Sequence, residues 1–242
     1  MRGAAASAAA LLLCASASSP GPDGGTAASP ALIGALRATI PLNPISVSDD
    51  PYVGWRGRTP PTPASGSVCA VRLETDGKHY RLATFPAESQ ARSDGYRVTH
   101  TGACGTCSTL QDLAVYLERP DLTAPVRRCG MMTDAKSLQC LEQLGFTPAC
   151  ARTWFFNAQN TRRVCFGECV RSWISGEAST HDGELNDCLR CDEERSGPVF
   201  KAVAGRTRRN SGIVSSIPRH DQEVAHVVHD YFPDAGTVEP PR

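Results

Sequence analysis

The chain has 242 residues, a length that fits one domain with extensions or two small domains. Its 25 basic and 25 acidic residues give a formal net charge of zero, so the composition supplies no electrostatic reason to expect nucleic acid or an anionic membrane as a partner. The 21 glycines and 18 prolines indicate that much of the chain is loop or linker.

The first residues have the pattern of a secretory leader. Arg2 precedes an apolar run over residues 4–15, and Ala15-Ser16-Ala17 fits a signal-peptidase site. This run is too short to cross a bilayer, and no later segment has the composition of a transmembrane helix. We therefore expect a signal peptide over residues 1–17 and a soluble protein that is secreted or resides in the secretory lumen. The acid-free, Arg-bearing stretch 31–42 leaves open a bipartite leader that targets an organelle.

Residues 18–66 are rich in Ala, Gly, Pro and Ser, and they contain no cysteine. This composition predicts a flexible leader or propeptide. Order is expected to begin near Ser67, so that a cysteine-rich globular domain spans residues 67–232. The last residues, 233–242, are expected to form a loose tail.

Two alternating runs flank Asp76-Gly77 within residues 67–85, which is a strong signal for a β-hairpin. Three further elements are expected in this half of the chain, from periodicity and from their boundary residues: a short helix over residues 86–93, a strand over 96–101 and a helix over 108–118.

The second half of the chain is predicted to be helical. Helices are expected over residues 134–146, within 147–176, over 198–205 and over 221–232. The aromatic run Trp154-Phe155-Phe156 favours core packing over a ligand pocket. The fold class predicted by this order is α+β, with a small antiparallel sheet followed by a disulfide-linked helical half.

Removal of the leader, with Cys14, leaves ten of the 11 cysteines, an even number that is typical of a disulfide framework. Cys165 and Cys169 lie four apart, and Cys188 and Cys191 lie three apart, so each pair would share one face of a helix. Two antiparallel helices would join them as Cys165–Cys191 and Cys169–Cys188. The alternative is a structural zinc site made by the same four thiolates. The expected leader favours the disulfides.

Cys104 and Cys107 form a C-G-T-C motif between an expected strand and an expected helix. This order is similar to the local setting of the motif in thioredoxin-like oxidoreductases. The resemblance implies that Cys104 attacks, that Cys107 resolves, and that His100 stabilises the thiolate as a cation. The alternative is that both cysteines are structural and that each is bonded elsewhere.

Residues 195–219 contain six basic and no acidic side chains. Candidate ligands for a small anion are four of these cations: Lys201, Arg206, Arg208 and Arg209. The sequence from Arg206 to Arg209 also fits a site cut by secretory proprotein convertases. A solvated basic loop beside the acidic run 192–194 is the third interpretation.

These patterns favour a secreted, disulfide-stabilised binding or structural module that is not an enzyme. Its partner would be a protein of unknown identity or a small anionic ligand, without a cofactor or a metal ion. A lumenal thiol–disulfide oxidoreductase is the first alternative, and a structural zinc-binding protein is the second.

Overall fold

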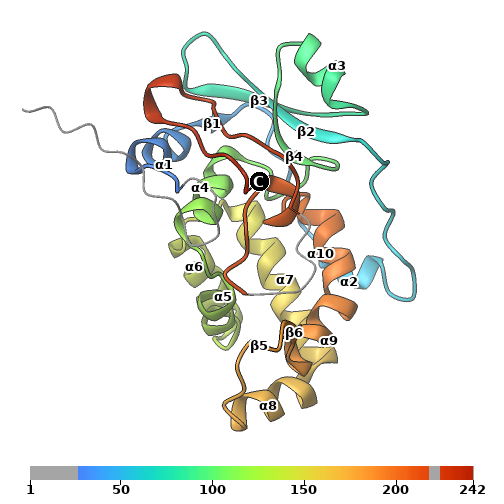
Figure 1. The fold of residues 1–242 in the computed structure, drawn as a ribbon. Coiled ribbons are helices and arrows are strands. Elements are labelled where there is room, and N and C mark those ends of the chain that lie inside the picture. Colours follow the sequence, from blue (N-terminus) through green and yellow to red (C-terminus); the bar gives the residue numbers. More distant parts are fainter. Residues whose placement is uncertain (1–26, 218–223, 242) are drawn as a thin grey trace, which may run out of the picture.

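The fold is taken from a computed structural model that describes residues 27–217 and 224–241. A small sheet lies at one end of the molecule, and most of the helices extend from it (Figure 1). The predicted α+β class is confirmed, because the described residues form ten α-helices and a four-stranded sheet.

The sheet has the strand order β1-β3-β2-β4. Strands β2 (Val68–Leu73) and β3 (His79–Phe85) form the predicted hairpin, and Asp76 accepts hydrogen bonds from two backbone N–H groups in its turn. Strand β4 (Arg97–Thr101) pairs antiparallel with β2. Strand β1 (Ile40–Pro41) pairs parallel with β3, so the sheet is mixed and the prediction of an antiparallel sheet needs this correction.

In the described residues, eight helices follow the β2–β3 hairpin, and strand β4 lies between the first two of them. Their bounds are α3 Glu88–Ser93, α4 Leu110–Glu118, α5 Thr123–Gly130, α6 Asp134–Gln143, α7 Pro148–Val164, α8 Phe166–Ile174, α9 Asp187–Arg195 and α10 Gly197–Ala204. A small hairpin of two short strands, β5 (Thr180–His181) and β6 (Glu184–Leu185), lies between α8 and α9. A 3-10 turn, η1 (Arg209–Ser211), follows α10. Helix α5 and this small hairpin have no counterpart in the sequence analysis.

Residues 27–66 correct the prediction of a flexible leader. Helix α1 (Pro30–Arg37) begins with a Ser29 side-chain cap and a proline in its first turn, and it buries Leu32 and Leu36 in the core beside α4. Helix α2 (Pro51–Gly54) brings Tyr52 into hydrogen bonds with α7 and Ser196. The many Ala, Gly, Pro and Ser residues of this segment hide the short apolar patterns of α1 and α2 when only its composition is considered. The expected signal peptide lies outside the described residues.

The C-terminal segment corrects two further predictions. Residues 224–232 are extended, although a helix was expected over 221–232, of which 221–223 lie outside the description. Their buried positions alternate with the period of a strand, at Val227, His229 and Tyr231. The backbone of His229 pairs in both directions with Val238 of the expected loose tail, and a 3-10 turn, η2 (Pro233–Ala235), lies between them.

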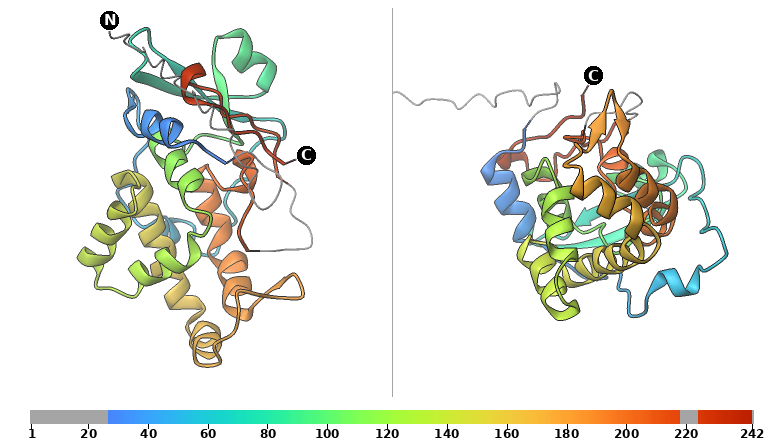
Figure 2. Two further views of the ribbon diagram at one scale, coloured as in Figure 1. Left: turned by 60° about the vertical axis from the view of Figure 1, so that its left-hand side comes forward. Right: turned by 90° about the horizontal axis from the view of Figure 1, so that it is seen from below.

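Helix α4 lies between the two main parts of the core. One part packs between the sheet, α1, α4 and the C-terminal segment, and the other packs among α4, α5, α6, α7 and α10. The left-hand view in Figure 2 shows α1 and the C-terminal segment near the sheet end of the molecule, and α8 at the opposite end. Among the described residues, none of the helices has the length and apolarity to cross a membrane.

Candidate functional site

Five disulfides include every cysteine of the described residues. They join Cys69 to Cys104, Cys107 to Cys150, Cys129 to Cys140, Cys165 to Cys191 and Cys169 to Cys188. The last two bonds tie α8 to α9, and they are the two that the antiparallel arrangement predicts. Such a density of disulfides indicates an oxidising environment.

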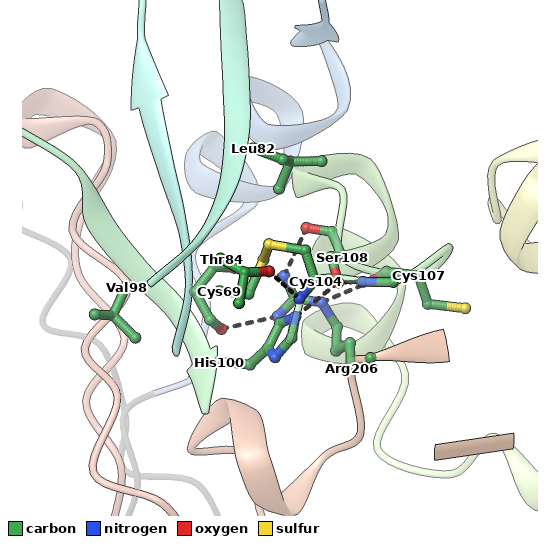
Figure 3. Close-up of a disulfide and its surroundings, with 12 residues drawn as sticks. Cys69, Leu82, Thr84, Val98, His100, Cys104, Cys107, Ser108 and Arg206 are labelled. Carbon is green, nitrogen blue, oxygen red and sulfur yellow. Dashed lines mark hydrogen bonds between the residues drawn. A yellow bond between two sulfur atoms is a disulfide. The ribbon is translucent and has the colours of Figure 1, made fainter. Parts of the chain in front are cut away.

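The structure separates the two cysteines of the C-G-T-C motif. Cys104 is bonded to Cys69 of β2 (Figure 3), and Cys107 is bonded to Cys150 of α7. Helix α4 begins only at Leu110, where Thr109 supplies its cap, so Cys107 does not sit at the helix N-terminus. The pairing implied by the thioredoxin-like resemblance is therefore corrected: the motif anchors the sheet on one side and α7 on the other.

His100 has a different role from the predicted thiolate partner. Its Nδ1–H donates to the Thr101 carbonyl, and its Nε2 lies 2.7 Å from the Ser108 hydroxyl, which donates to it. Burial, aided by the positive charge of Arg206, lowers the pKa of His100 to about 3. The ring is therefore neutral at physiological pH. Both His100 and Ser108 are fully buried, so this hydroxyl–imidazole pair meets no solvent-borne substrate.

Arg206 is also corrected, because it is 0 % exposed and does not face an external ligand. Its guanidinium donates to the carbonyl oxygens of Cys107, Thr99 and Ser108 and to the hydroxyls of Ser211 and Thr99. These bonds hold the segment after α10 against β4 and the C-G-T-C motif. Arg206 is therefore not accessible as part of a processing site.

The zinc interpretation is corrected for the same reason as the redox one. Cys165, Cys169, Cys188 and Cys191 are all in disulfides, and a bonded sulfur is not a thiolate ligand. The described residues contain no cluster of three or more His, Cys, Asp or Glu side chains placed to hold a metal ion.

The buried ionisable groups predict acid sensitivity. Burial lowers the pKa of His100 and of His229 to about 3 from 6.5, so below pH 6.5 the unfolded chain binds two protons that the folded protein does not bind. Burial raises the pKa of Asp112 to about 6 from 3.8, so the folded protein binds one extra proton between these values. One net proton then favours unfolding, and the free energy of unfolding should fall by about 1.4 kcal/mol per pH unit just below pH 6. Burial also raises the pKa of Asp192, so the slope should become shallower toward pH 4.

Denaturant unfolding at several pH values tests this expectation. In a His100→Asn variant, the unfolded chain binds one proton fewer, so the slope with pH should approach zero over the same interval. An unchanged slope in the variant would show that His100 is not the buried neutral group described above.

An open groove of about 730 Å³ lies between α5, α7, α8, α9, α10 and the segment 207–217. The elements that form it occupy the half of the molecule away from the sheet (Figure 1). Its large apolar lining residues include Leu122, Val126, Met131, Trp154, Phe166, Val170, Trp173, Leu189, Phe200 and Ile217. The aromatic run predicts core packing for Trp154, and the structure places this residue both against the core and on the groove wall.

Large apolar side chains at the mouth of the groove are open to solvent. Trp173 is 74 % exposed and Phe166 is 63 % exposed, and both are on α8. Their spacing with Val170 is that of one helix face, which was a readable signal in the sequence. Exposed aromatic side chains around a concavity are typical of a binding site.

Three of the four basic residues predicted to bind an anion line this groove: Lys201, Arg208 and Arg209. The guanidinium of Arg208 donates to the carbonyls of Tyr116 and Arg119, and it lies 5.7 Å from the centre of the Tyr116 ring. Arg127 of α5 and Arg162 of α7 also line the groove. The acidic lining residues are Asp121, Glu177, Asp192 and Glu193.

Two residues that line the groove each contain a fully buried polar atom that lacks a hydrogen bond of good geometry within the described part of the chain: the Tyr116 hydroxyl and the Trp154 indole N–H. A weak contact from the indole N–H lowers the pKa of the Tyr116 phenol, but burial raises it more, so the phenol stays protonated. Because an indole N–H only donates, the Tyr116 O–H still has no acceptor.

A protein family described as "Family of unknown function (DUF8771)" matches residues 134–227. This segment supplies α7 to α10 and the 207–217 wall of the groove, whereas α5 lies before it. No curated protein and no solved structure matches the chain. The fold and the groove define the protein as a disulfide-stabilised α+β domain with an open apolar concavity.

Proposed function

We propose that this protein is a secreted or lumenal binding module whose groove between α5 and α8 to α10 takes an apolar ligand. The observation that carries the proposal is the exposed aromatic mouth, Phe166 and Trp173, above an apolar wall that includes Trp154 and Phe200. Burying these side chains against a ligand removes apolar surface from water, which supplies the driving force for binding.

The size and the rigidity of the groove support this function. Its volume, about 730 Å³, falls within the range of roughly 300–1,000 Å³ that is common for small-molecule sites. Helix α8, which carries the exposed aromatics, is fixed to α9 by Cys169–Cys188, and Cys165–Cys191 fixes the residue before it. A wall held in place before binding loses little conformational entropy when the ligand arrives.

The disulfides and the expected leader support a location in the secretory pathway or outside the cell. Disulfides persist in those compartments, whereas cytosolic reductants keep thiols reduced. A binding role without catalysis also agrees with the structural tasks of the C-G-T-C cysteines and His100.

A pair of neighbouring substitutions tests the groove. Titration with a fluorescent apolar probe such as anilinonaphthalene sulfonate should give saturable binding to the native protein. Trp173→Ser should weaken this binding about tenfold, because loss of a buried Trp contact in a complex commonly costs about 1–2 kcal/mol or more.

The matched control is Ile174→Ser. Ile174 follows Trp173 on α8 and is 76 % exposed, but it does not line the groove. Its replacement should leave probe affinity unchanged. Equal affinities of the Trp173→Ser variant and the native protein would overturn the groove as the binding site.

A further inference from the structure

We propose that the Cys169–Cys188 disulfide is a site of thiol–disulfide exchange, which a small dithiol opens before it opens the other disulfides of the described residues. Opening of this bond releases α8 and weakens ligand binding in the groove. The exchange itself is independent of the proposed function, and only its effect on binding rests on that function. Three observations carry the inference: the exposure of the two cysteines, the burial of cysteines in the other bonds, and the few buried residues of α8.

The exposure of the two cysteines is the first observation. Both Cys169 and Cys188 are partly exposed, and both line the groove. In every other disulfide of the described residues, at least one cysteine is buried. A thiolate attacks a sulfur atom directly, so access to the sulfur helps to decide which bond reacts. The groove is therefore a route by which a small thiol reaches either cysteine of this bond.

The thiolate that leaves gives the second observation. Attack at one sulfur expels the other cysteine as a thiolate, and a thiolate of lower pKa leaves faster. Cys104 and Cys140 are also partly exposed, but their partners, Cys69 and Cys129, are 0 % and 1 % exposed. Because burial raises the pKa of a thiol, expulsion of either partner is slow. Either cysteine of the proposed bond instead leaves into the open groove, where water solvates the charge.

The position of α8 depends on this bond, which is the third observation. The helix has nine residues, of which only Ser172 is buried, and the Ser172 hydroxyl donates to Glu177 in the turn after the helix. The buried Cys165–Cys191 disulfide holds only the residue before α8. When the proposed bond opens, α8 therefore keeps the anchor at its start and loses the one in its middle.

Release of α8 acts on the groove because this helix carries the exposed aromatic mouth, Phe166 and Trp173. A mobile wall has to be ordered when a ligand binds, and the entropy lost in that ordering lowers the affinity. The oxidised protein is thus the form that binds tightly, and the reduced protein is the form that releases its ligand.

The exchange consumes one dithiol for each bond opened. One thiolate of the dithiol attacks the sulfur of one cysteine, forms a mixed disulfide and expels the other cysteine, which takes up a proton. The second thiol of the reagent loses its proton and attacks the reagent's own sulfur in the mixed disulfide. This step closes a cyclic disulfide and expels the first cysteine, which is also protonated. Two electrons pass from the dithiol to the protein.

Dithiothreitol tests the order in which the bonds open. Oxidised protein, with any free thiol blocked beforehand, is treated with dithiothreitol for increasing times, and new thiols are alkylated and located by peptide mass mapping. Cys169 and Cys188 should be alkylated about tenfold faster than any other pair, since their bond combines access with a solvated leaving thiolate. Equal rates for this pair and another pair would refute the inference, whether or not the groove binds a ligand.

Trypsin reports the release of α8 without any ligand. Arg171 is exposed on α8, and an ordered helix protects the peptide bond that follows it. In protein reduced at this bond alone, cleavage after Arg171 should be about tenfold faster than in oxidised protein. Cleavage after Arg128, which is exposed on α5, should not change and is the control. Unchanged cleavage after Arg171 would show that the bond does not hold α8.

Probe binding tests the effect on the groove. Mild reduction should lower the affinity of the saturable site for anilinonaphthalene sulfonate several-fold. A Cys169→Ser/Cys188→Ser variant should bind as weakly before any treatment and should not respond to dithiothreitol. The reduced native protein gives the same comparison if the variant does not fold. Equal affinities before and after reduction would contradict the effect on the groove. A native protein that binds no probe would instead contradict the proposed function, and the thiol mapping and the cleavage after Arg171 would still decide the exchange.

Discussion

Replacement of Arg206 by Met should lower the free energy of unfolding by about 4 kcal/mol, a loss at the upper end of single-substitution effects. The guanidinium is fully buried and donates to five oxygens, of which three are backbone carbonyls. Methionine fills a similar volume but donates nothing, so several buried acceptors lose their donor, and each such loss costs about 1–3 kcal/mol when unrelieved.

Arg206 connects several elements of the fold, so the loss of its hydrogen bonds should destabilise the whole protein. Its acceptors lie on β4 at Thr99, at Cys107 of the C-G-T-C motif and the following Ser108, and on η1 at Ser211. The residue therefore joins the sheet, the start of α4 and the segment after α10. In the described part of the chain, no carboxylate forms an ion pair with it, so neutral oxygens accept all of its hydrogen bonds, and the Asp112 carboxyl stabilises the charge only at longer range.

Denaturant unfolding of oxidised protein measures the effect. Arg206→Lys should recover only part of the stability, because an ammonium has three donors and lacks the planar fork of the guanidinium. Arg195→Met is the control, since Arg195 is exposed at the end of α9. One ordinary hydrogen bond contributes about 1 kcal/mol to stability. If the free energy of unfolding of Arg206→Met lies within about 1 kcal/mol of the native value, Arg206 does not hold these elements together.

Local signals explain why the β2–β3 hairpin was predictable from sequence. Asp76-Gly77 sets the turn, and the flanking runs alternate with the period of a strand. The two disulfides of α8 and α9 were predictable for a similar reason, because helical spacing leaves few ways to join Cys165, Cys169, Cys188 and Cys191. In both cases the residues that decide the structure are close together in sequence.

The site was harder to predict because residues of the same type differ in whether the fold buries them. Arg206, Arg208 and Arg209 look alike in sequence, yet the first is a buried structural group and the other two line the groove. Glycine at position 205, with φ of +72°, turns the chain so that the next side chain enters the core. The packing of the C-terminal segment, in which the Tyr231 hydroxyl donates to the Val98 carbonyl, and the insertion of α1 depend on long-range contacts, which local periodicity does not encode.

Introduction of a single methyl group at Gly105, in the middle of the C-G-T-C motif, should destabilise the protein by about 3 kcal/mol or more. A Cβ atom at this position would lie 2.3 Å from the Val203 carbonyl oxygen and 2.5 Å from the Gly205 nitrogen. These are backbone atoms, so no side-chain rotation relieves the overlap. The end of α10 would have to move away, with loss of the bonds from Thr106 N–H to Val203 and from Cys107 N–H to Ala204.

Gly34→Ala provides the comparison for this substitution. Gly34 is exposed in the middle of α1, and a Cβ added there meets no atom within 4 Å. The helix propensity of alanine should make that variant more stable by about 0.5–1 kcal/mol. If Gly105→Ala lowers the free energy of unfolding while Gly34→Ala raises it, the close approach of α10 requires a glycine at position 105. A Gly105→Ala variant as stable as the native protein would mean that the contact between α10 and the motif is looser than described.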